Sequence, residues 1–371
     1  MTSFSSVHIT GPDWRNLCDQ ALARIGDAND RQLAFVYLAD DLAGDSDRIV
    51  DYLRDHSGIP HWVGCVGMGL CSNAHESYAE PAISILVTPF GADDFRIIPT
   101  LDGNMNAWLD ASRDWRERHL ATVAVVHGDP GSTQLPELLT ELSEGLQGGF
   151  LVGGIASAEK LATQIADGVT GGGLSGVLFS GSIAISTGLT QGCSLIGHKH
   201  RVTRCQRNII ETIDDRPALE VFKEDIGEVL ARNLQQVGGY IFAALPIAGS
   251  DTGDYLVRNL IGIDPDRGLL AIGDMLEPGM EIQFARRDAE TAREDLARMV
   301  EGLVKRLPGP PRGALYHSCL GRGRNLFGED SGELKLVHKL LGDVPLAGFY
   351  ANGEISHKRL YGYTGVLTLF S

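Results

Sequence analysis

The sequence predicts a mixed α/β fold in which layered sheets are covered by helices, and two observations lead to that prediction. Short apolar strands alternate along the chain with helices whose apolar residues recur at three- and four-residue steps. Many of the strands run into glycine-containing loops, and 46 glycines among 371 residues are well above average usage. Because each amphipathic helix needs a sheet to cover, we expect mixed sheets with helices on one face.

The length of the chain predicts two domains, because one ordinary core does not extend over 371 residues. The first helix is expected from Trp14 to Ile25, where Leu17 and Ala21 continue one apolar stripe. We assign residues 1–31 to this helix and its lead-in, 32–214 to an N-terminal domain and 215–371 to a C-terminal domain. Asp215 is the expected N-cap of the helix that opens the second domain.

One order of elements returns along the chain: strand, loop, helix, strand with a glycine loop, strand. It starts near residues 33, 121 and 313, and the glycine segments 64–67, 153–156 and 348–351 would be equivalent. A more diverged fourth copy is expected from residue 240, with its loop at 247–254. The sequence therefore predicts an internal repeat, so that both halves are built from strand-helix-strand-strand units with right-handed crossovers.

Charge and cysteine usage narrow the class of protein. The formal net charge is −16, so nucleic acid and anionic membranes are poor candidates for partners. The six cysteines have neither CxxC nor zinc-finger spacing, which predicts free thiols, no metal site and a reducing compartment. We expect no cofactor, because the glycine run 171–173 is not followed by Gly-Lys-Ser/Thr. Without a signal peptide or an apolar run near the ~20 residues of a membrane helix, a cytoplasmic location is expected.

The candidate ligand site lies in the last sixty residues. Cys319 follows an apolar strand, and Gly321, Arg322 and Gly323 follow it directly. Arg322 could form a two-pronged contact with a carboxylate or phosphate, or it could make a structural salt bridge. Cys319 is expected to line a pocket; the alternative is a small buried residue under a turn.

A second loop, Asn352-Gly353-Glu354, follows the next apolar strand, and Asn-Gly is a turn pair. Glu354 could accept a hydrogen bond from a ligand amine, cap a loop or pair with Arg322. If it both paired with Arg322 and met an amine, the site would suit a zwitterion such as an amino acid. The further candidates for ligand contact are Ser157, Gly154 and Asn259.

Two other classes of function stay open. An enzyme would use Cys319 as a nucleophile, or Arg322 and Glu354 as an acid/base pair, and would need a base within reach of the thiol. An interaction scaffold would instead show a large exposed apolar patch and no deep pocket.

Several motifs, in order, resemble those of the FIST family. Gly153-Gly154 with Ser157, the stretch 192–204 and the segment 215–220 are similar to the FIST N-terminal domain and its junction. The segments 257–264, 313–328 and 346–355 are similar to the FIST C-terminal domain. The segment 66–70 departs from the pattern, since a small-residue and Glu motif would be expected there. The resemblance implies a stand-alone sensory module that binds small molecules, amino acids among the candidates, and signals through a separate partner protein.

Overall fold

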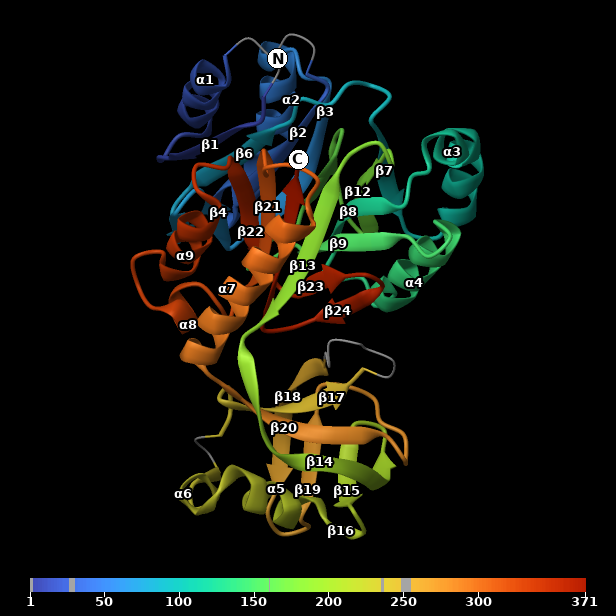
Figure 1. The fold of residues 1–371 in the computed structure, drawn as a ribbon, viewed down its shortest axis with the longest axis vertical. Coiled ribbons are helices and arrows are strands. Elements are labelled where there is room, and N and C mark those ends of the chain that lie inside the picture. Colours follow the sequence, from blue (N-terminus) through green and yellow to red (C-terminus); the bar gives the residue numbers. More distant parts are fainter. Residues whose placement is uncertain (1–2, 27–30, 160, 235–236, 248–254) are drawn as a thin grey trace. The chain divides into compact units, whose positions relative to one another are not determined.

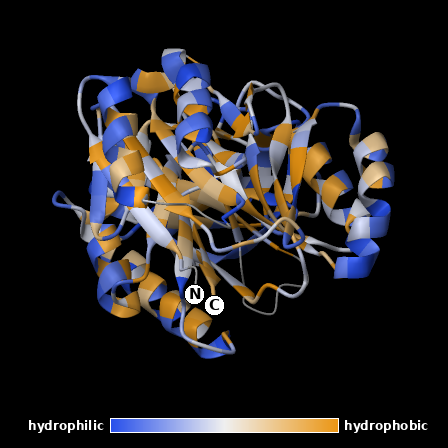
Figure 2. Cartoon of the chain, turned by 90° about the horizontal axis from the view of Figure 1, so that it is seen from above, coloured by the Kyte–Doolittle hydropathy of each residue, from blue (hydrophilic) through white to orange (hydrophobic). Residues whose placement is uncertain are grey.

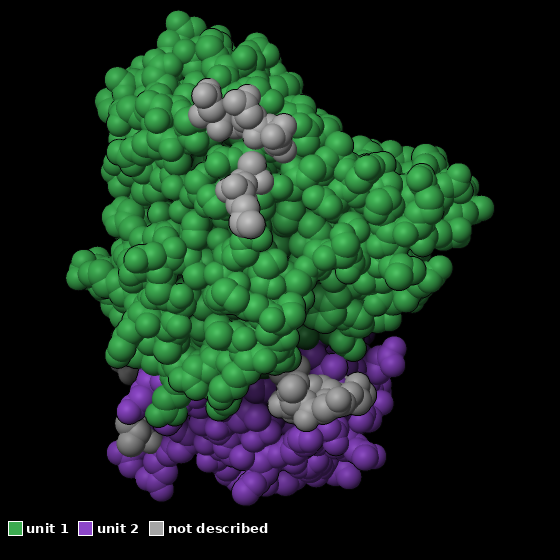
Figure 3. Space-filling view, turned by 45° about the horizontal axis from the view of Figure 1, so that its top comes forward, with its two compact units in different colours: residues 1–191, 293–371 green, residues 192–292 purple. Residues whose placement is uncertain are grey.

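The computed structural model describes residues 3–26, 31–159, 161–234, 237–247 and 255–371. The chain forms two compact units, of which unit 1 comprises residues 1–191 and 293–371 and unit 2 comprises residues 192–292 (Figures 1 and 3). Both units are built from sheets with covering helices, which confirms the predicted mixed α/β class. The predicted boundary at residue 215 lies within unit 2, so the compact units divide the chain differently, and that boundary stays a prediction.

The first sheet of unit 1 has the strand order β1-β6-β2-β3-β10-β11. β2 and β3 are parallel neighbours joined through helix α2, and β6 runs antiparallel to β2. The elements here are β1 (Ser5–Thr10), α1 (Trp14–Ile25), β2 (Leu33–Ala39), the 3₁₀ helix η1 (Asp40–Asp45), α2 (Ser46–Ser57), β3 (His61–Gly67), β6 (Ala82–Val87), β10 (Gln164–Ala166) and β11 (Val169–Thr170). The predicted first helix is confirmed, and a strand starts at Leu33, where the first strand of the repeated order is expected.

The second sheet repeats this arrangement with the order β24-β23-β9-β8-β12-β7. β8 and β9 are parallel, and β12 runs antiparallel to β8. The elements are β7 (Phe95–Leu101), α3 (Met105–His119), β8 (Val123–Gly128), α4 (Leu135–Gly145), β9 (Phe150–Ile155), β12 (Leu174–Phe179), β23 (Glu354–Ser356) and β24 (Arg359–Tyr361).

The third sheet has the order β13-β25-β21-β22-β4-β5, with β21 parallel to β22 and antiparallel to β25. Its crossover contains the short helix α8, in a stretch predicted as a plain loop, and then α9. The elements are β4 (Gly69–Ser72), β5 (His75–Tyr78), β13 (Ile185–Gln191), α7 (Ala289–Arg306), β21 (Gly313–Cys319), α8 (Arg324–Phe327), α9 (Gly332–Leu341), β22 (Leu346–Ala351) and β25 (Thr364–Phe370).

Short hairpins join the three sheets into a closed cycle. The hairpin β4–β5 follows β3 along the chain but pairs with β22 of the third sheet. In the same way β10 pairs with β3 of the first sheet, and β23 pairs with β9 of the second. Each sheet is thus completed by a hairpin from another segment of the chain, and the connections of unit 1 have a threefold character.

The three sheets share one inner core. Side chains alternate across a strand, so Phe35 and Tyr37 of β2 face inward, whereas Val36 and Leu38 face the helices α1 and α2. The inner core also receives residues of β8, β9, β21, β22 and β25. In Figure 2 the central strands carry mainly hydrophobic and neutral colours, and the surrounding helices show hydrophilic patches on the outside.

Three polar rings meet at the centre of this inner core. Tyr37, His127 and His317 occupy the same position in β2, β8 and β21, and their ring centroids lie 5.6 to 5.9 Å apart. The Tyr37 hydroxyl lies 3.0 Å from His317 Nε2 and 3.3 Å from His127 Nε2. A hydroxyl can donate only one proton, so it donates to one imidazole and accepts from the other.

The parallel strand pairs depend on glycine at one matching position. Gly64, Gly153 and Gly348 are paired with Val36, Val126 and Tyr316 in the three sheets. A Cβ added at any of these glycines would overlap the carbonyl oxygen of its partner residue. Only glycine therefore allows the two strands to approach this closely.

Unit 2 is inserted in the chain between β13 and α7. In the first and second sheets, the edge strand is followed by a helix after a short link: β1 leads into α1, and β7 leads into α3. In the third, residues 192–292 stand in that place. On the unit 1 side the two flanking elements are clamped, because the Asp295 carboxylate accepts from the Thr190 hydroxyl at 2.9 Å and from the Gln191 backbone N–H at 2.7 Å.

Unit 2 is an antiparallel β-barrel. Its strands follow the order β14-β20-β17-β18-β19-β15-β16, and β14 pairs also with β15, which closes the sheet. A separate apolar cluster fills it. The elements are β14 (Cys193–Gln206), β15 (Ile209–Ile213), β16 (Arg216–Pro217), α5 (Ala218–Ile226), α6 (Glu228–Ala231), β17 (Ile241–Pro246), β18 (Tyr255–Asp264), β19 (Leu269–Ile272) and β20 (Glu281–Arg287).

Two sequence predictions about unit 2 are wrong. The segment from residue 240 is not a fourth copy, because β17 pairs antiparallel with both of its neighbours, β18 and β20, where the repeat requires a parallel neighbour. Most of its predicted loop, 248–254, lies outside the described residues. Asp215 is not the N-cap of α5, since Pro217 occupies that place and Asp215 has a left-handed φ of 60° in the preceding turn.

The matching glycines give a test of strand packing. We expect Gly348→Ala to lower the free energy of unfolding by about 3 kcal/mol, because overpacking of a filled interior forces the backbone to shift. Gly44→Ala is the matched control, since a Cβ at Gly44 meets no atom within 4 Å. Urea denaturation of both variants measures the difference, and equal loss in the two would contradict the packing argument.

The buried rings predict acid sensitivity. Burial lowers the pKa of His317 to about 3 and the pKa of His127 well below its ordinary value. Below pH ~6.5 the unfolded chain therefore binds more protons than the folded chain. Each histidine then lowers the free energy of unfolding by about 1.4 kcal/mol for every unit by which the pH decreases. Denaturation between pH 7 and 5.5 should show a shallower slope for His317→Phe than for the wild type. An unchanged slope would exclude His317 as the source.

Candidate ligand-binding site

The candidate residues of the two C-terminal loops lie at one edge of the third sheet. β21 and β22 are parallel, with Cys319 level with Ala351, so the loops after both strands leave from the same edge. The Leu320 backbone N–H donates to the Ala351 carbonyl at 3.0 Å, which ties the first loop to β22. Glu354, just after the second loop, pairs with Gly154 of β9. The structure thus brings Cys319, Glu354 and Gly154 into one region.

Arg322 is fully buried in an ion pair that the sequence did not reveal. Its Nε donates to Glu333 Oε1 at 2.7 Å, and Nη2 lies 2.7 Å from the same oxygen. Glu333 also accepts from the Tyr316 hydroxyl at 2.7 Å and from the Gly323 backbone N–H at 2.8 Å. The Phe327 ring lies 5.0 Å from the guanidinium carbon. Arg322 therefore has the structural salt-bridge role, with a partner on α9 that no motif marks.

Two buried atoms in this region make no hydrogen bond of normal geometry to a described residue, although the Glu354 carboxyl as a whole also interacts with the Cys319 thiol. These atoms are Arg322 Nη1 and Glu354 Oε1. The other Glu354 oxygen accepts from the Thr364 hydroxyl at 2.8 Å and from the Thr364 backbone N–H at 3.1 Å. Buried polar atoms nearly always have a partner in the protein, in water or in a ligand. Nη1 and Oε1 are therefore the groups that a ligand or a water molecule would complete.

The burial of Glu354 changes its chemistry. Desolvation raises the pKa of Glu354 to about 8, against the weaker opposing effects of the Thr364 hydrogen bonds and the Arg322 charge. The carboxyl is mostly protonated at neutral pH, so it can donate a hydrogen bond. The sequence left three roles open for Glu354, namely accepting from a ligand amine, capping a loop or pairing with Arg322. The protonated form does not favour the first of these roles.

Cys319 is half-buried beside Glu354. Burial raises the pKa of the Cys319 thiol well above its ordinary value, and the charge of Glu354 acts in the same direction. The Gly321 backbone N–H lies 3.5 Å from Sγ, and no described basic side chain hydrogen-bonds to that sulfur. Because the thiolate is the reactive form, this environment favours a lining role over nucleophilic catalysis.

The loop glycines allow close packing, and one polar side chain lies at the surface. A Cβ on Gly321 would lie 2.9 Å from a tyrosine ring, and one on Gly323 would overlap the Tyr78 hydroxyl. Gly353 has a φ of 146°, in the region that glycine favours. Asn352 is exposed, so it is the residue of the second loop that a ligand could reach from solvent.

The remaining predicted residues have structural partners or lie elsewhere. Ser157 Oγ donates to the Tyr350 carbonyl at 2.6 Å and accepts from the Met68 backbone N–H at 2.9 Å, so it links all three sheets. A Cβ on Gly154 would lie 2.7 Å from a side chain of β22, which explains the glycine. Asn259 lies on β18 in unit 2, and its membership of this site stays a prediction.

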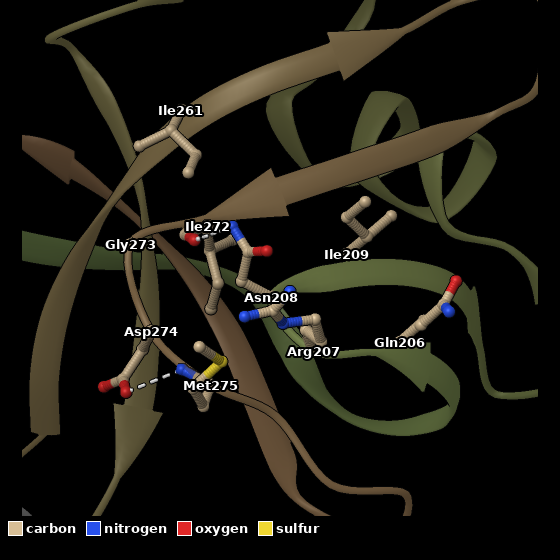
Figure 4. A pocket seen from close by; sticks show the side chains of 9 residues that line it. All are labelled: Gln206, Arg207, Asn208, Ile209, Ile261, Ile272, Gly273, Asp274 and Met275. Atoms are coloured by element: carbon tan, nitrogen blue, oxygen red, sulfur yellow. Dashed lines mark hydrogen bonds between the residues drawn. The ribbon is translucent and has the colours of Figure 1, made fainter.

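Two hollows lie away from all the predicted site residues. A pocket of about 690 Å³ lies in unit 2 (Figure 4). Another, of about 600 Å³, lies in unit 1 near the first turns of α3 and α4. For the pocket in unit 2, the sequence offers one signal, the turn Arg207-Asn208 between two strands. Nothing in the sequence links that turn to the distant segments that complete the pocket. Its lining residues are Gln206, Arg207, Asn208, Ile209, Ile261, Ile272, Gly273, Asp274 and Met275.

Two features are absent from the part of the chain that the structure describes. No group of three or more His, Cys, Asp or Glu side chains there could hold a metal ion. None of the helices in these residues is long and apolar enough to cross a membrane.

The fold and the sheet-edge residues define a two-unit α/β protein with a candidate binding region in its third sheet. The family model described as the FIST N domain matches residues 32–216, and the FIST C domain matches residues 218–357. The chain therefore belongs to the FIST family, which confirms the resemblance seen in the sequence. FIST domains are generally associated with signal transduction and small-ligand sensing.

Relatives of similar length occur in mycobacteria. The uncharacterized protein Rv0628c of Mycobacterium tuberculosis is 34% identical over 326 residues, which cover 83% of each chain. The uncharacterized protein Mb0898c of Mycobacterium bovis is 30% identical over 331 residues, covering 84% of this chain and 83% of its own. Among solved structures, PurLQS from Thermotoga maritima matches 99% of this chain and 72% of its own at 12% identity and a TM-score of 0.23, too low to support a comparison of folds.

Glu354 gives a test of the site that needs no ligand. A carboxyl whose pKa rises from its unfolded value to about 8 on folding contributes stability that is lost as pH rises through that range. Between pH 6.5 and 8, Glu354→Gln should remove a downward slope of up to about 1.4 kcal/mol per pH unit. Denaturation of wild type and variant at four pH values measures this, and parallel curves would mean that Glu354 is already ionised.

Proposed function

We propose that the protein is a sensor that binds a small molecule at the edge of the third sheet, beside Cys319, Arg322 and Glu354. The observation that carries the proposal is the pair of buried atoms without partners, Arg322 Nη1 and Glu354 Oε1. Asn352 and Gly321 would lie at the mouth of the site, because both are at least partly exposed. A ligand that met Nη1 and Oε1 would remove the cost of leaving them unsatisfied.

We infer that the ligand carries a carboxylate, as an amino acid or a related metabolite does. At neutral pH the protonated Glu354 and the free Nη1 atom of Arg322 are both donors, and a carboxylate accepts from both. The positive charge of Arg322 is already matched by Glu333, so the site attracts the anion through hydrogen bonds more than through net charge. The amino group of an amino acid would then meet the Asn352 side chain at the mouth.

We further infer that the three sheets of unit 1, each with its helix and hairpin, arose from one repeated element. The ligand site would belong to the third sheet. The support is the shared pairing pattern and the three matching glycines. At the position of Glu354 in the third hairpin, the second hairpin has Gln164 and the first has Leu70, as their registers with β9, β3 and β22 place them. The ionisable group is thus peculiar to the third hairpin.

We propose that the sensor acts in the cytoplasm and passes its signal to a separate partner protein. All six cysteines are free thiols, which supports a reducing compartment. The enzyme alternative has less support, because the Cys319 thiol is held protonated and Arg322 is occupied by Glu333.

Binding should depend on pH in a way that identifies Glu354. For a carboxylate ligand we expect affinity to be level below pH 7 and to fall about tenfold per unit above pH 8, as Glu354 loses its proton. Glu354→Gln keeps a hydrogen-bond donor and should abolish the loss of affinity above pH 8. Gln164 has the same place in the second hairpin, which shows that a glutamine side chain is accommodated at such a position. Titration calorimetry with the common amino acids, matched carboxylates and matched amines at three pH values measures the dependence.

The control for this experiment is Glu329→Gln, which alters an exposed carboxylate in the loop before α9. It should leave both affinity and pH dependence unchanged. Failure of every compound to bind the wild type would sink the proposal. Affinity that rises with pH would assign Glu354 to the ligand's ammonium group instead.

A further inference from the structure

The pocket of unit 2 belongs to a module that is complete in itself. The barrel has its own apolar interior, and the pocket lies outside that interior, at one end of β19. Three separate segments meet there: the β14–β15 turn with its flanking residues, β18, and the end of β19 with the loop that follows it. Figure 4 shows the side chains of these segments around one hollow.

The apolar lining of this pocket is unusually exposed. Ile209, Ile261 and Met275 are 37%, 60% and 62% exposed, and all three line the same hollow. Single exposed apolar side chains are common on protein surfaces and need no explanation. Three large ones around one concave site are typical of a surface that becomes covered. Buried Ile272 supplies a further apolar contact beneath them.

The polar lining leaves one positive charge without a partner. Arg207 is exposed, and its guanidinium forms no ion pair or hydrogen bond with any residue that the structure describes. In Figure 4 its side chain reaches from the turn towards Met275. The acidic residue of the pocket is already neutralised, because Asp274 accepts from Arg258 Nε at 2.7 Å and from the Met275 backbone N–H at 2.8 Å.

The backbone holds this cation in place. Arg207 has a left-handed φ of 57°, and its carbonyl accepts from the Leu276 backbone N–H at 2.8 Å. The neighbouring Asn208 side chain donates to the Ile272 carbonyl at 3.1 Å, which fixes the turn against β19. Hydrogen bonds therefore hold the turn both to β19 and to the loop after β19, so the position of the Arg207 backbone is fixed before a ligand binds.

We propose that unit 2 binds a small organic anion with an apolar body. Its carboxylate or phosphate would meet the Arg207 guanidinium, and its body would cover Ile209, Ile261 and Met275. The pocket volume of about 690 Å³ is that of a small-molecule site. This site lies in a different unit from the one beside Glu354 and does not depend on it.

The test uses titration calorimetry of the full chain with indole-3-acetate, benzoate and phenyl phosphate. Benzamide has a similar body without the charge, and acetate has the charge without the body. We expect at least one aromatic anion to bind, and benzamide and acetate to bind at least about tenfold more weakly, because a charged hydrogen bond and a buried ring each contribute that much.

Three variants locate the binding. Arg207→Asn should weaken the aromatic anion about tenfold or more, and asparagine accepts the left-handed backbone of this turn. Ile261→Ala should weaken it about fivefold through lost apolar contact. Arg267→Gln removes another exposed arginine of the same unit and should match the wild type.

The proposal is overturned by any of several results. These are no binding of the three aromatic anions at millimolar concentration, equal affinity of wild type and Arg207→Asn, or equal affinity for benzoate and benzamide. A concentration-dependent dimer that Ile261→Ala abolishes, seen by light scattering, would assign the surface to a second copy of the chain.

Discussion

The contact among Tyr37, His127 and His317 sets the geometry on which unit 1 depends. Each ring belongs to the first strand of the parallel pair in a different sheet, so the three sheets meet in the inner core at these positions. Because strand side chains alternate, this register decides which residues face inward and which face the helices. It also decides where each strand ends. The loops that follow β21 and β22 therefore leave the sheet together, with Cys319 and Glu354 on neighbouring paths.

Desolvation separates the two charged candidates of that region into different roles. Arg322 keeps its charge because Glu333 lies against it, with further hydrogen bonds to the carboxylate from Tyr316 and Gly323. Among the described residues none forms an ion pair with Glu354, so burial favours its neutral form. A structural ion pair and a neutral carboxyl thus stand side by side. In the sequence both are ordinary charged residues, and only the folded structure distinguishes their roles.

The sequence predicted elements whose pattern is local and missed those whose partners are distant. The strands 33–38, 82–87 and 346–351 are apolar on both faces, which is typical of strands covered on two sides. The short hairpin strands β4, β5, β10 and β11 have no such pattern, and each sheet that they complete is specified by contacts far away in the chain. The helix α3 was missed as well, because few of its residues are buried.

The same distinction holds for the candidate site. The two loops were found because glycine, arginine and asparagine follow apolar strands, and the parallel pairing does place them at one edge. Glu333 was missed because a single glutamate at the start of a helix carries no signal. The hollow beside Arg207 was missed because its lining comes from three segments that only the barrel brings together.

The place of the inserted barrel has an evolutionary consequence. The chain enters and leaves it next to one clamp, formed by Asp295 with Thr190 and Gln191. The two ends of the insertion are therefore held close together by the host unit alone, whatever lies between them. A different inserted domain at this junction would leave unit 1 undisturbed, because the contact that holds the two ends together lies entirely within unit 1. The link between an edge strand and its helix is thus a point at which this architecture could exchange one module for another while the host keeps its three sheets.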